Sequence, residues 1–160
     1  MKPDYKDILY EVADYVCTIT INRPKVLNAF TGDTIEELED AVQRTYDDKN
    51  IGVVVLTGAG DRAFSAGGDV KWESSGGLED AEWYLGRYIV DCPKPVIARV
   101  PGYAIGGGNH LAYVCDFTIA ADHSVFGQTG PRVGSPASGY AVSHSANILG
   151  HKRAREMWMM

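Results

Sequence analysis

Two glycine-rich turns about forty residues apart place the strongest constraint on this chain. The first runs from Ala63 to Asp69 (AFSAGGD), and the second from Pro101 to His110 (PGYAIGGGNH). Each follows an apolar, strand-like run, and the second leads directly into a helix-like run. Such turns can direct bare backbone N–H groups at one point, and two N–H groups on one oxygen make an oxyanion hole. The pair therefore indicates a site that stabilises negative charge on an oxygen atom.

Composition narrows the class of protein. The chain has 160 residues, enough for one domain with a real core, and its 45% hydrophobic and 22% charged residues are ordinary for a globular protein. The net charge of −6 argues against nucleic acid as the main partner. No apolar stretch suggests a secretory signal or a membrane span. Three widely spaced cysteines show no zinc-ligand pattern, so we expect reduced thiols, no metal site and a cytoplasmic location.

Strand-like and helix-like segments alternate along the chain, which predicts the α/β class. A β-branched, alternating run predicts a hairpin near the N-terminus with its turn at Ala13-Asp14. A helix is expected next, capped by Thr31 or Asp33. We expect strands at 7–12, 15–22, 52–57, 96–100 and 117–121, and helices at 79–90, 107–115, 139–149 and 151–159.

The second turn can take part in chemistry through its backbone and through a histidine. Gly106, Gly107 and Gly108 open a helix-like run, where N–H groups lack internal partners and lie at the positive end of the helix dipole. His110 follows Gly107 by three residues, so on a helix it shares the face of the turn and could act as a general base or acid. The alternatives are close helix–strand packing for the glycines, and a core or interface role for His110.

A dinucleotide site is the competing interpretation, because residues 58–63 read GxGxxA after a strand. A Rossmann fingerprint needs a helix directly after these glycines, and here the segment 64–68 interrupts it. The chain contains neither a P-loop motif nor a GxSxG nucleophile elbow. The glycine-turn interpretation is therefore preferred.

Taken in order, these segments resemble the crotonase (enoyl-CoA hydratase/isomerase) superfamily over nearly the whole chain. The matching segments are Asn22-Arg23-Pro24, Leu27 to Phe30, Val53 to Gly58, Ala63 to Asp69, Pro93 to Ala98, Gly102 to Gly108 and Cys115 to Ala121. The resemblance implies a spiral of ββα units and an acyl-CoA substrate. It also implies a homotrimer, or a hexamer made as a dimer of trimers. Family members continue into a C-terminal helical trimerisation segment, so we expect residues 1–160 to form the core domain without it.

The resemblance also implies site residues. The N–H groups of Gly68 and Gly107 would hold the oxygen of a thioester enolate. No tightly bound cofactor is expected, because coenzyme A enters as part of the substrate. The residues implied in holding it, largely through backbone atoms, are Val26, Leu27, Ala29, Ser65, Ala66 and Asp69.

The chain departs from ordinary hydratases at both of their catalytic glutamates, where it has His110 and Gly130. The segment 126–135 is instead similar to 1,4-dihydroxy-2-naphthoyl-CoA synthase and 2-ketocyclohexanecarboxyl-CoA hydrolase, which make or break a ring C–C bond beside a CoA thioester. In that branch, a glycine matching Gly130 leaves room for a bicarbonate ion that can serve as base. An aspartate of the branch is replaced here by Ala137, which leaves His110, Ser135 and Tyr140 as the polar candidates.

The resulting hypothesis is an enzyme that stabilises a thioester enolate and hydrolyses or forms a ring C–C bond in an alicyclic or aromatic-derived acyl-CoA. His110 would be the base or acid, with Ser135 and Tyr140 orienting water or a ring carbonyl. Two alternatives stay open: an enoyl-CoA hydratase/isomerase, and a non-catalytic CoA-binding or assembly subunit.

Overall fold

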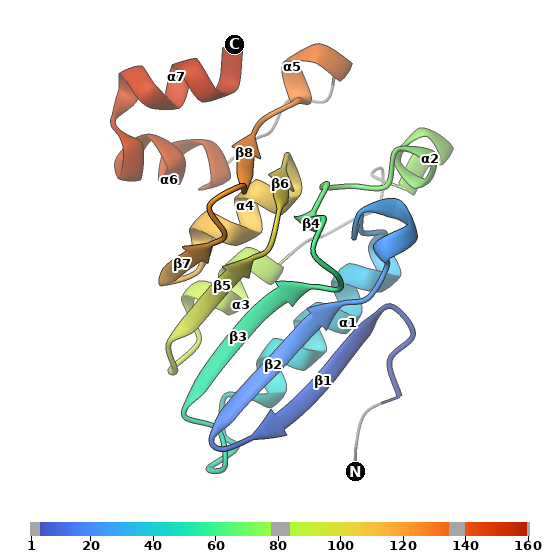
Figure 1. Ribbon diagram of the computed structural model, residues 1–160, viewed down its shortest axis with the longest axis vertical. Helices are drawn as coiled ribbons and strands as arrows, with labels where there is room; N and C mark the ends of the chain where they lie inside the picture. Colours follow the sequence, from blue (N-terminus) through green and yellow to red (C-terminus); the bar gives the residue numbers. More distant parts are fainter. Residues whose placement is uncertain (1–3, 78–83, 135–139, 160) are drawn as a thin grey trace.

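The larger of two sheets confirms the strands expected from the sequence. The computed structural model describes residues 4–77, 84–134 and 140–159. Five strands lie side by side in the order β1-β2-β3-β5-β7 (Figure 1). β1 and β2 are antiparallel, and all other neighbours in this sheet are parallel. The strands span Ile8–Ala13, Val16–Ile21, Val53–Gly58, Val96–Val100 and Phe117–Ala120.

The first hairpin shows how the sequence pattern becomes a two-sided sheet. Its turn residues Asp14 and Tyr15 have φ values of 49° and 64°, the left-handed conformation that suits a tight hairpin turn. The turn therefore lies one residue later than expected. Along β2, Cys17, Ile19 and Ile21 are fully buried while the residues between them are half-buried. This alternation turns one face of the sheet toward the helices.

A second sheet, which the sequence did not indicate, carries the strands β4, β6 and β8. These strands span Ala63–Ser65, Tyr103–Ile105 and Val125–Gly127, and they pair in parallel. Each follows a strand of the larger sheet and precedes a helix, giving the repeats β3-β4-α2, β5-β6-α4 and β7-β8-α5. The ββα spiral expected from the resemblance is thereby confirmed. The glycine turns follow β4 and β6, so the smaller sheet brings them side by side.

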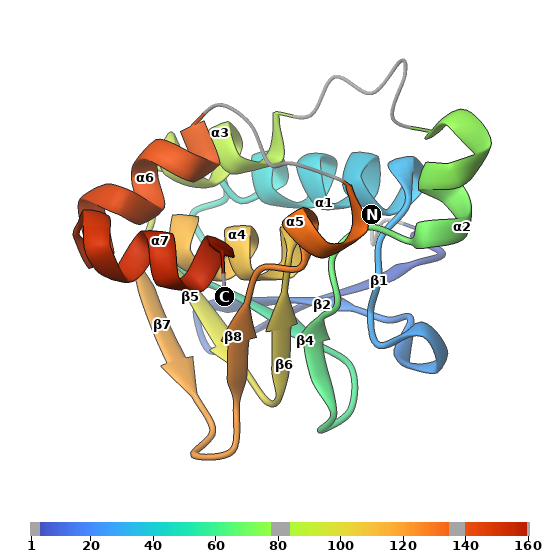
Figure 2. The ribbon, with the colours of Figure 1, turned by 90° about the horizontal axis from the view of Figure 1, so that it is seen from above.

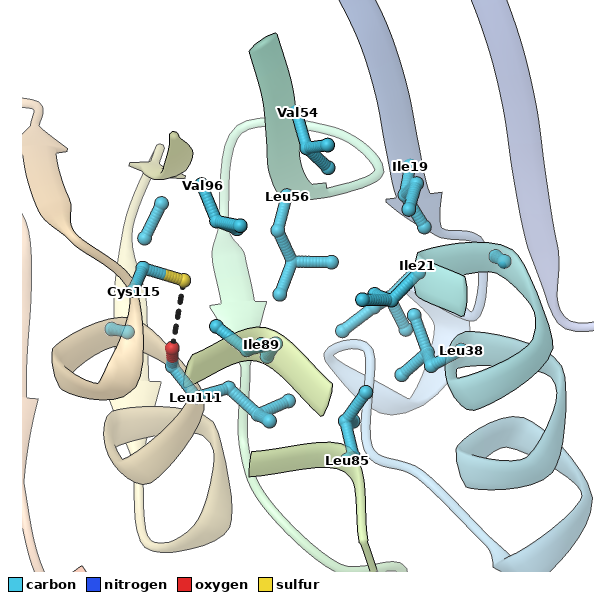
Figure 3. Packing of buried hydrophobic residues seen from close by; sticks show 14 of the residues in the cluster. Ile19, Ile21, Leu38, Val54, Leu56, Leu85, Ile89, Val96, Leu111 and Cys115 are labelled. Carbon is cyan, nitrogen blue, oxygen red and sulfur yellow. Dashed lines mark hydrogen bonds between the residues drawn. The ribbon is translucent and has the colours of Figure 1, made fainter. Parts of the chain in front are cut away.

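Helices cover one side of the strands (Figure 2). α1 (Gly32–Arg44), α3 (Leu85–Val90) and α4 (Gly107–Val114) direct Leu38, Ile89 and Leu111 at the apolar face of the larger sheet (Figure 3). α6 (Tyr140–Leu149) and α7 (His151–Met159) pack against each other, and α6 contacts α4. α7 matches the expected helix at 151–159, and α6 matches the expected 139–149 from Tyr140 on. Residue 139, and residues 79–83 of the expected 79–90 helix, lie outside the described residues. In the part of the chain that the structure describes, no helix is long and apolar enough to cross a membrane.

Thr31 caps α1, which settles the choice between the two expected caps. Its Oγ accepts a hydrogen bond from the Thr34 N–H at 3.5 Å, and the Thr34 Oγ accepts one from the Thr31 N–H at 3.2 Å. We expect Thr31→Ala to lower the free energy of unfolding by about 1 kcal/mol, because these N–H groups have no other partner inside the helix. Urea unfolding would measure the loss. Thr31→Ser keeps the oxygen and is the matched control, and equal stability of both variants would contradict the assignment.

Candidate functional site

Most N–H groups of the first glycine turn donate hydrogen bonds to other groups of the protein. Ala66 N–H donates to the Leu27 carbonyl at 3.0 Å, and Asp69 N–H to the Phe30 carbonyl at 2.9 Å. Gly67 N–H donates to the Ser65 hydroxyl at 3.1 Å, and its φ of 90° is a conformation that glycine adopts without strain. Among the described residues, the N–H of Gly68 has no hydrogen-bond partner. The turn therefore presents this one donor.

The segment 26–30, which contains three of the expected CoA-binding residues, is held against this turn. Asn28 is fully buried and left-handed, and its Nδ2 donates to the carbonyls of Ala59 at 3.0 Å and Ala63 at 2.8 Å. Ser65 Oγ donates to the Asn28 carbonyl at 2.8 Å. Ser65 is fully buried, and its hydroxyl also accepts from the Gly67 N–H, so this residue supports the turn from within the protein. Val26 is exposed, and Leu27 and Ala29 flank the buried Asn28.

Asp69, the last residue of the expected CoA-binding set, has a structural task as well. Its Oδ1 caps α2 (Val70–Trp72) by accepting from the N–H groups of Lys71 and Trp72. Its Oδ2 lies 3.4 Å from Nη2 of Arg23, and the same guanidinium lies 3.4 Å from Asp7. This half-buried ion network ties the first glycine turn to the end of the hairpin.

The second glycine turn ends in the free N-terminus of α4. Gly106 has φ 57° and ψ −121°, a backbone conformation that favours glycine, and its N–H donates to the Gly127 carbonyl at 3.0 Å. The first backbone bond of the helix runs from His110 N–H to the Gly106 carbonyl at 3.1 Å. Within the described residues, the Gly107 N–H therefore has no partner and lies at the positive end of the helix.

The two turns are in contact, and glycine is required where they meet. A Cβ added to Gly67 would lie 3.0 Å from the Gly107 nitrogen and 2.9 Å from the Ile105 carbonyl oxygen. One added to Gly107 would lie 2.5 Å from Cζ of the buried Phe30 ring, and one added to Gly108 would overlap the Ser65 carbonyl. Close packing, the alternative explanation for these glycines, is therefore present together with two unpaired N–H groups on touching turns.

His110 lies one helical turn after Gly107, with its ring turned toward the C-terminal helices. Its centroid is 5.5 Å from those of Tyr113 and of Trp158 on α7. Burial lowers the pKa of His110 to about 4, so the imidazole is neutral at pH 7. Its Nε2 is buried and has no hydrogen-bond partner among the described residues. A buried nitrogen without a partner is costly, which makes it a candidate for contact with a bound molecule.

The structure describes only some of the other residues expected near the site. Gln128 Nε2 donates to the Gly106 carbonyl at 3.5 Å, so the segment before Gly130 does lie at the second turn. Gly130 itself begins the short helix α5 (Gly130–Val133). Ser135 lies outside the described residues, and of Tyr140 only the backbone, at the start of α6, is described. The structure thus gathers the two glycine turns, His110 and Gln128.

One acidic residue at the first turn was missed by the sequence reasoning. The Glu73 carboxyl lies against Gly68, in the space that a side chain on residue 68 would occupy. Burial, reinforced by the charge of Asp69, raises the pKa of Glu73. Its sequence position, one helical turn after Asp69, was the available signal, but only the fold turns this side chain back toward the glycines.

An apolar cavity of about 180 Å³ lies beside α4, and Asn109 at the end of the second glycine turn contributes to its lining. Its lining comes from α4, β7, β8, α6 and α7 and comprises Asn109, Ala112, Tyr113, Thr118, Phe126, Ser145, Ile148, Leu149 and Met157. Among the described residues, no group of three or more His, Cys, Asp or Glu side chains is placed to hold a metal ion.

Solved structures with this fold include the three that follow. An enoyl-CoA hydratase from Mycobacterium avium subsp. paratuberculosis K-10 is 32% identical with a TM-score of 0.88, covering 98% of this chain and 64% of its own. An enoyl-CoA hydratase/carnithine racemase from Magnetospirillum magneticum is 28% identical with a TM-score of 0.88, and the match covers 96% of this chain and 61% of that protein. An enoyl-CoA hydratase from Bacillus anthracis is 29% identical with a TM-score of 0.85, and the match covers 95% of this chain and 62% of that protein.

The chain thus spans less than two thirds of the length of these relatives. The family model for enoyl-CoA hydratase/isomerase matches residues 11–160, which include both glycine turns, the smaller sheet, α4 and the larger sheet from the middle of β1 on. With its ββα spiral and paired glycine turns, the chain belongs to the enoyl-CoA hydratase/isomerase family.

Proposed function

We propose that this chain binds an acyl-CoA and stabilises its thioester enolate through the N–H groups of Gly68 and Gly107. The observation that carries the proposal is that the turns touch while each leaves one N–H without a partner among the described residues. A thioester C–H is hard to remove until the enolate oxygen is stabilised. Preorganised donors in a site shielded from water act most strongly on such an anion.

The proposed substrate is an alicyclic or aromatic-derived acyl-CoA with a ketone on the ring. The likeness of segment 126–135 to enzymes that make or break ring C–C bonds supports this choice, as does the absence of carboxylates at residues 110 and 130. Water would add to the ring ketone, and the ring C–C bond would break with its electron pair entering the thioester enolate. One proton from water would then reach the α-carbon, giving a free carboxyl group at one end and an intact thioester at the other.

His110 would contact the water or the ring carbonyl as a neutral imidazole. Its low pKa keeps the ring uncharged at pH 7, and its unpartnered Nε2 supports a hydrogen bond to that water or carbonyl. Ser135 and Tyr140 would orient the same group, and Gly130 would leave room for the ring or for bicarbonate. These four assignments remain predictions.

Coenzyme A would lie along the segment 26–30 and the first glycine turn. The backbone bonds between these segments and the exposure of Val26 support this path. We also propose a homotrimer or hexamer. Phe117 and Ile119 on β7 are 62% and 64% exposed, an apolar face that favours coverage by another part of the assembly.

Simple enoyl-CoA hydration or isomerisation is the second candidate, because the structural relatives named above are enoyl-CoA hydratases or close variants. Incubation with crotonyl-CoA and with 2-oxocyclohexane-1-carbonyl-CoA, followed by mass spectrometry, separates the two. We expect the cyclic ketone to gain one water with its thioester intact. Turnover of crotonyl-CoA alone would favour the second candidate, tight binding without turnover would favour a non-catalytic subunit, and failure to bind any acyl-CoA would overturn all three.

A further inference from the structure

The carboxyl of Glu73 lies against Gly68, the first of the two proposed oxyanion glycines. The Glu73 N–H donates to the Asp69 carbonyl at 2.9 Å, which continues α2 by one residue. The chain then passes through a kinked turn, Glu73–Gly77, in which Gly76 has the non-helical values φ 91° and ψ 7°.

The indole of Trp72 fixes this turn in place. A Cβ added to Gly32, at the start of α1, would lie 3.2 Å from its Cζ2, and one added to Gly77 would overlap the ring. The indole is thus enclosed between two glycines, one on α1 and one at the end of the kinked turn. The turn that carries Glu73 is therefore anchored to a helix of the core, and its carboxyl is positioned by packing.

No described residue holds the Glu73 carboxyl by a hydrogen bond or an ion pair. The side chain is nonetheless partly buried, and both its burial and the nearby charge of Asp69 disfavour the ionised form. A structural carboxylate would normally have a cationic or N–H partner in such a place. A carboxyl that gains and loses a proton requires the opposite: access and a raised affinity for the proton.

We propose that the Glu73 carboxyl transfers the proton at the α-carbon of the thioester held by Gly68 and Gly107. In one direction the α-C–H bond breaks, its electron pair enters the enolate and the charge settles on the thioester oxygen, while the proton goes to a Glu73 oxygen. In the other direction Glu73 returns that proton to carbon. The α-carbon is two bonds from the thioester oxygen, and the carboxyl lies against the residue that binds this oxygen.

This inference rests on the proposed function and supplies a group that it lacks. Neither residue 110 nor residue 130 is a carboxylate in this chain. The His110 ring contacts Tyr113 and the Trp158 ring of α7, whereas Glu73 contacts the first glycine turn. Glu73 would therefore transfer the proton at the α-carbon, and His110 would contact the ring carbonyl.

Deuterium exchange at the α-carbon of cyclohexanecarbonyl-CoA tests the inference, since this thioester has one α-hydrogen and no ketone to hydrolyse. We expect the wild-type protein to exchange this hydrogen in D₂O, as followed by NMR, and Glu73→Gln to slow exchange by about 100-fold or more while binding the thioester as before. Glu73→Ala should behave alike and regain exchange with added acetate, which a purely structural role would not produce.

Glu36→Gln is the matched control, because Glu36 is an exposed carboxylate on α1. It should exchange at the wild-type rate. Exchange by Glu73→Gln at the wild-type rate, or loss of exchange in His110→Phe but not in Glu73→Gln, would overturn the inference. A wild-type protein that binds the thioester without exchanging it would do the same and leave thioester binding standing, whereas failure to bind it at all would remove the proposed function as well.

Discussion

Gly107→Ala is expected to lower the turnover of 2-oxocyclohexane-1-carbonyl-CoA by about 100-fold or more, the usual effect of losing one oxyanion donor. The new Cβ would lie 2.5 Å from Cζ of Phe30, and that ring is itself buried in the core, so the contact forces a shift. The first turn of α4 must therefore shift and carry the residue 107 N–H away from the thioester oxygen. Steady-state kinetics would measure the loss, which should appear in kcat more than in KM.

Gly86→Ala provides the control for this substitution. Gly86 lies in α3, and a Cβ added there meets nothing within 4 Å. Alanine at this position should leave turnover unchanged and raise stability by up to about 1 kcal/mol, because glycine disfavours a helix. Wild-type turnover by a folded Gly107→Ala variant would contradict the role of this N–H group.

Acidification from pH 7 to pH 4 is expected to destabilise the protein by about 3 kcal/mol through His110 alone. The pKa of His110 falls from its ordinary 6.5 to about 4 in the folded chain. Between these values the unfolded chain binds a proton that the folded chain excludes, so stability falls as the pH falls through this window. Above pH 6.5 both states hold a neutral imidazole, and the contribution no longer changes.

Urea unfolding at a series of pH values would measure this dependence. His110→Phe keeps an aromatic ring beside Tyr113 and Trp158 but cannot be protonated, so its stability curve should be flatter than that of the wild type by this amount. Subtracting the two curves removes the titration of the carboxylates, including Glu73 and Glu39, whose pKa values are raised. His123→Gln, at an exposed position, is the control and should retain the wild-type slope. Parallel curves for the wild type and His110→Phe would show that His110 is not buried in its neutral form.

The larger sheet and the main helices could be predicted because their signals are local. The alternation of Cys17, Ile19 and Ile21 specifies one buried face, and Thr31 supplies the oxygen that begins α1. The smaller sheet could not be predicted in the same way. Its strands are three residues long, too short for a period to appear, and they exist through pairing with one another.

The candidate site likewise has features that the sequence predicts and features that only the fold determines. The glycines at 67, 68, 106, 107 and 108 are visible in the sequence because backbone conformation and close approach restrict which residues can stand there. Which N–H groups remain unpaired is not visible, since that depends on bonds from the 66–69 turn to Leu27 and Phe30, nearly forty residues away. The same holds for the low pKa of His110, which burial produces.

By itself, the sequence determined the α/β class, the strands of the larger sheet and the two turns, because each depends on neighbours along the chain. Only the tertiary structure decided that the turns touch, that Gly68 and Gly107 present the unpaired N–H groups, and that Glu73 lies against Gly68. These are contacts between distant segments, and they exist only when the smaller sheet brings the ends of β4 and β6 together.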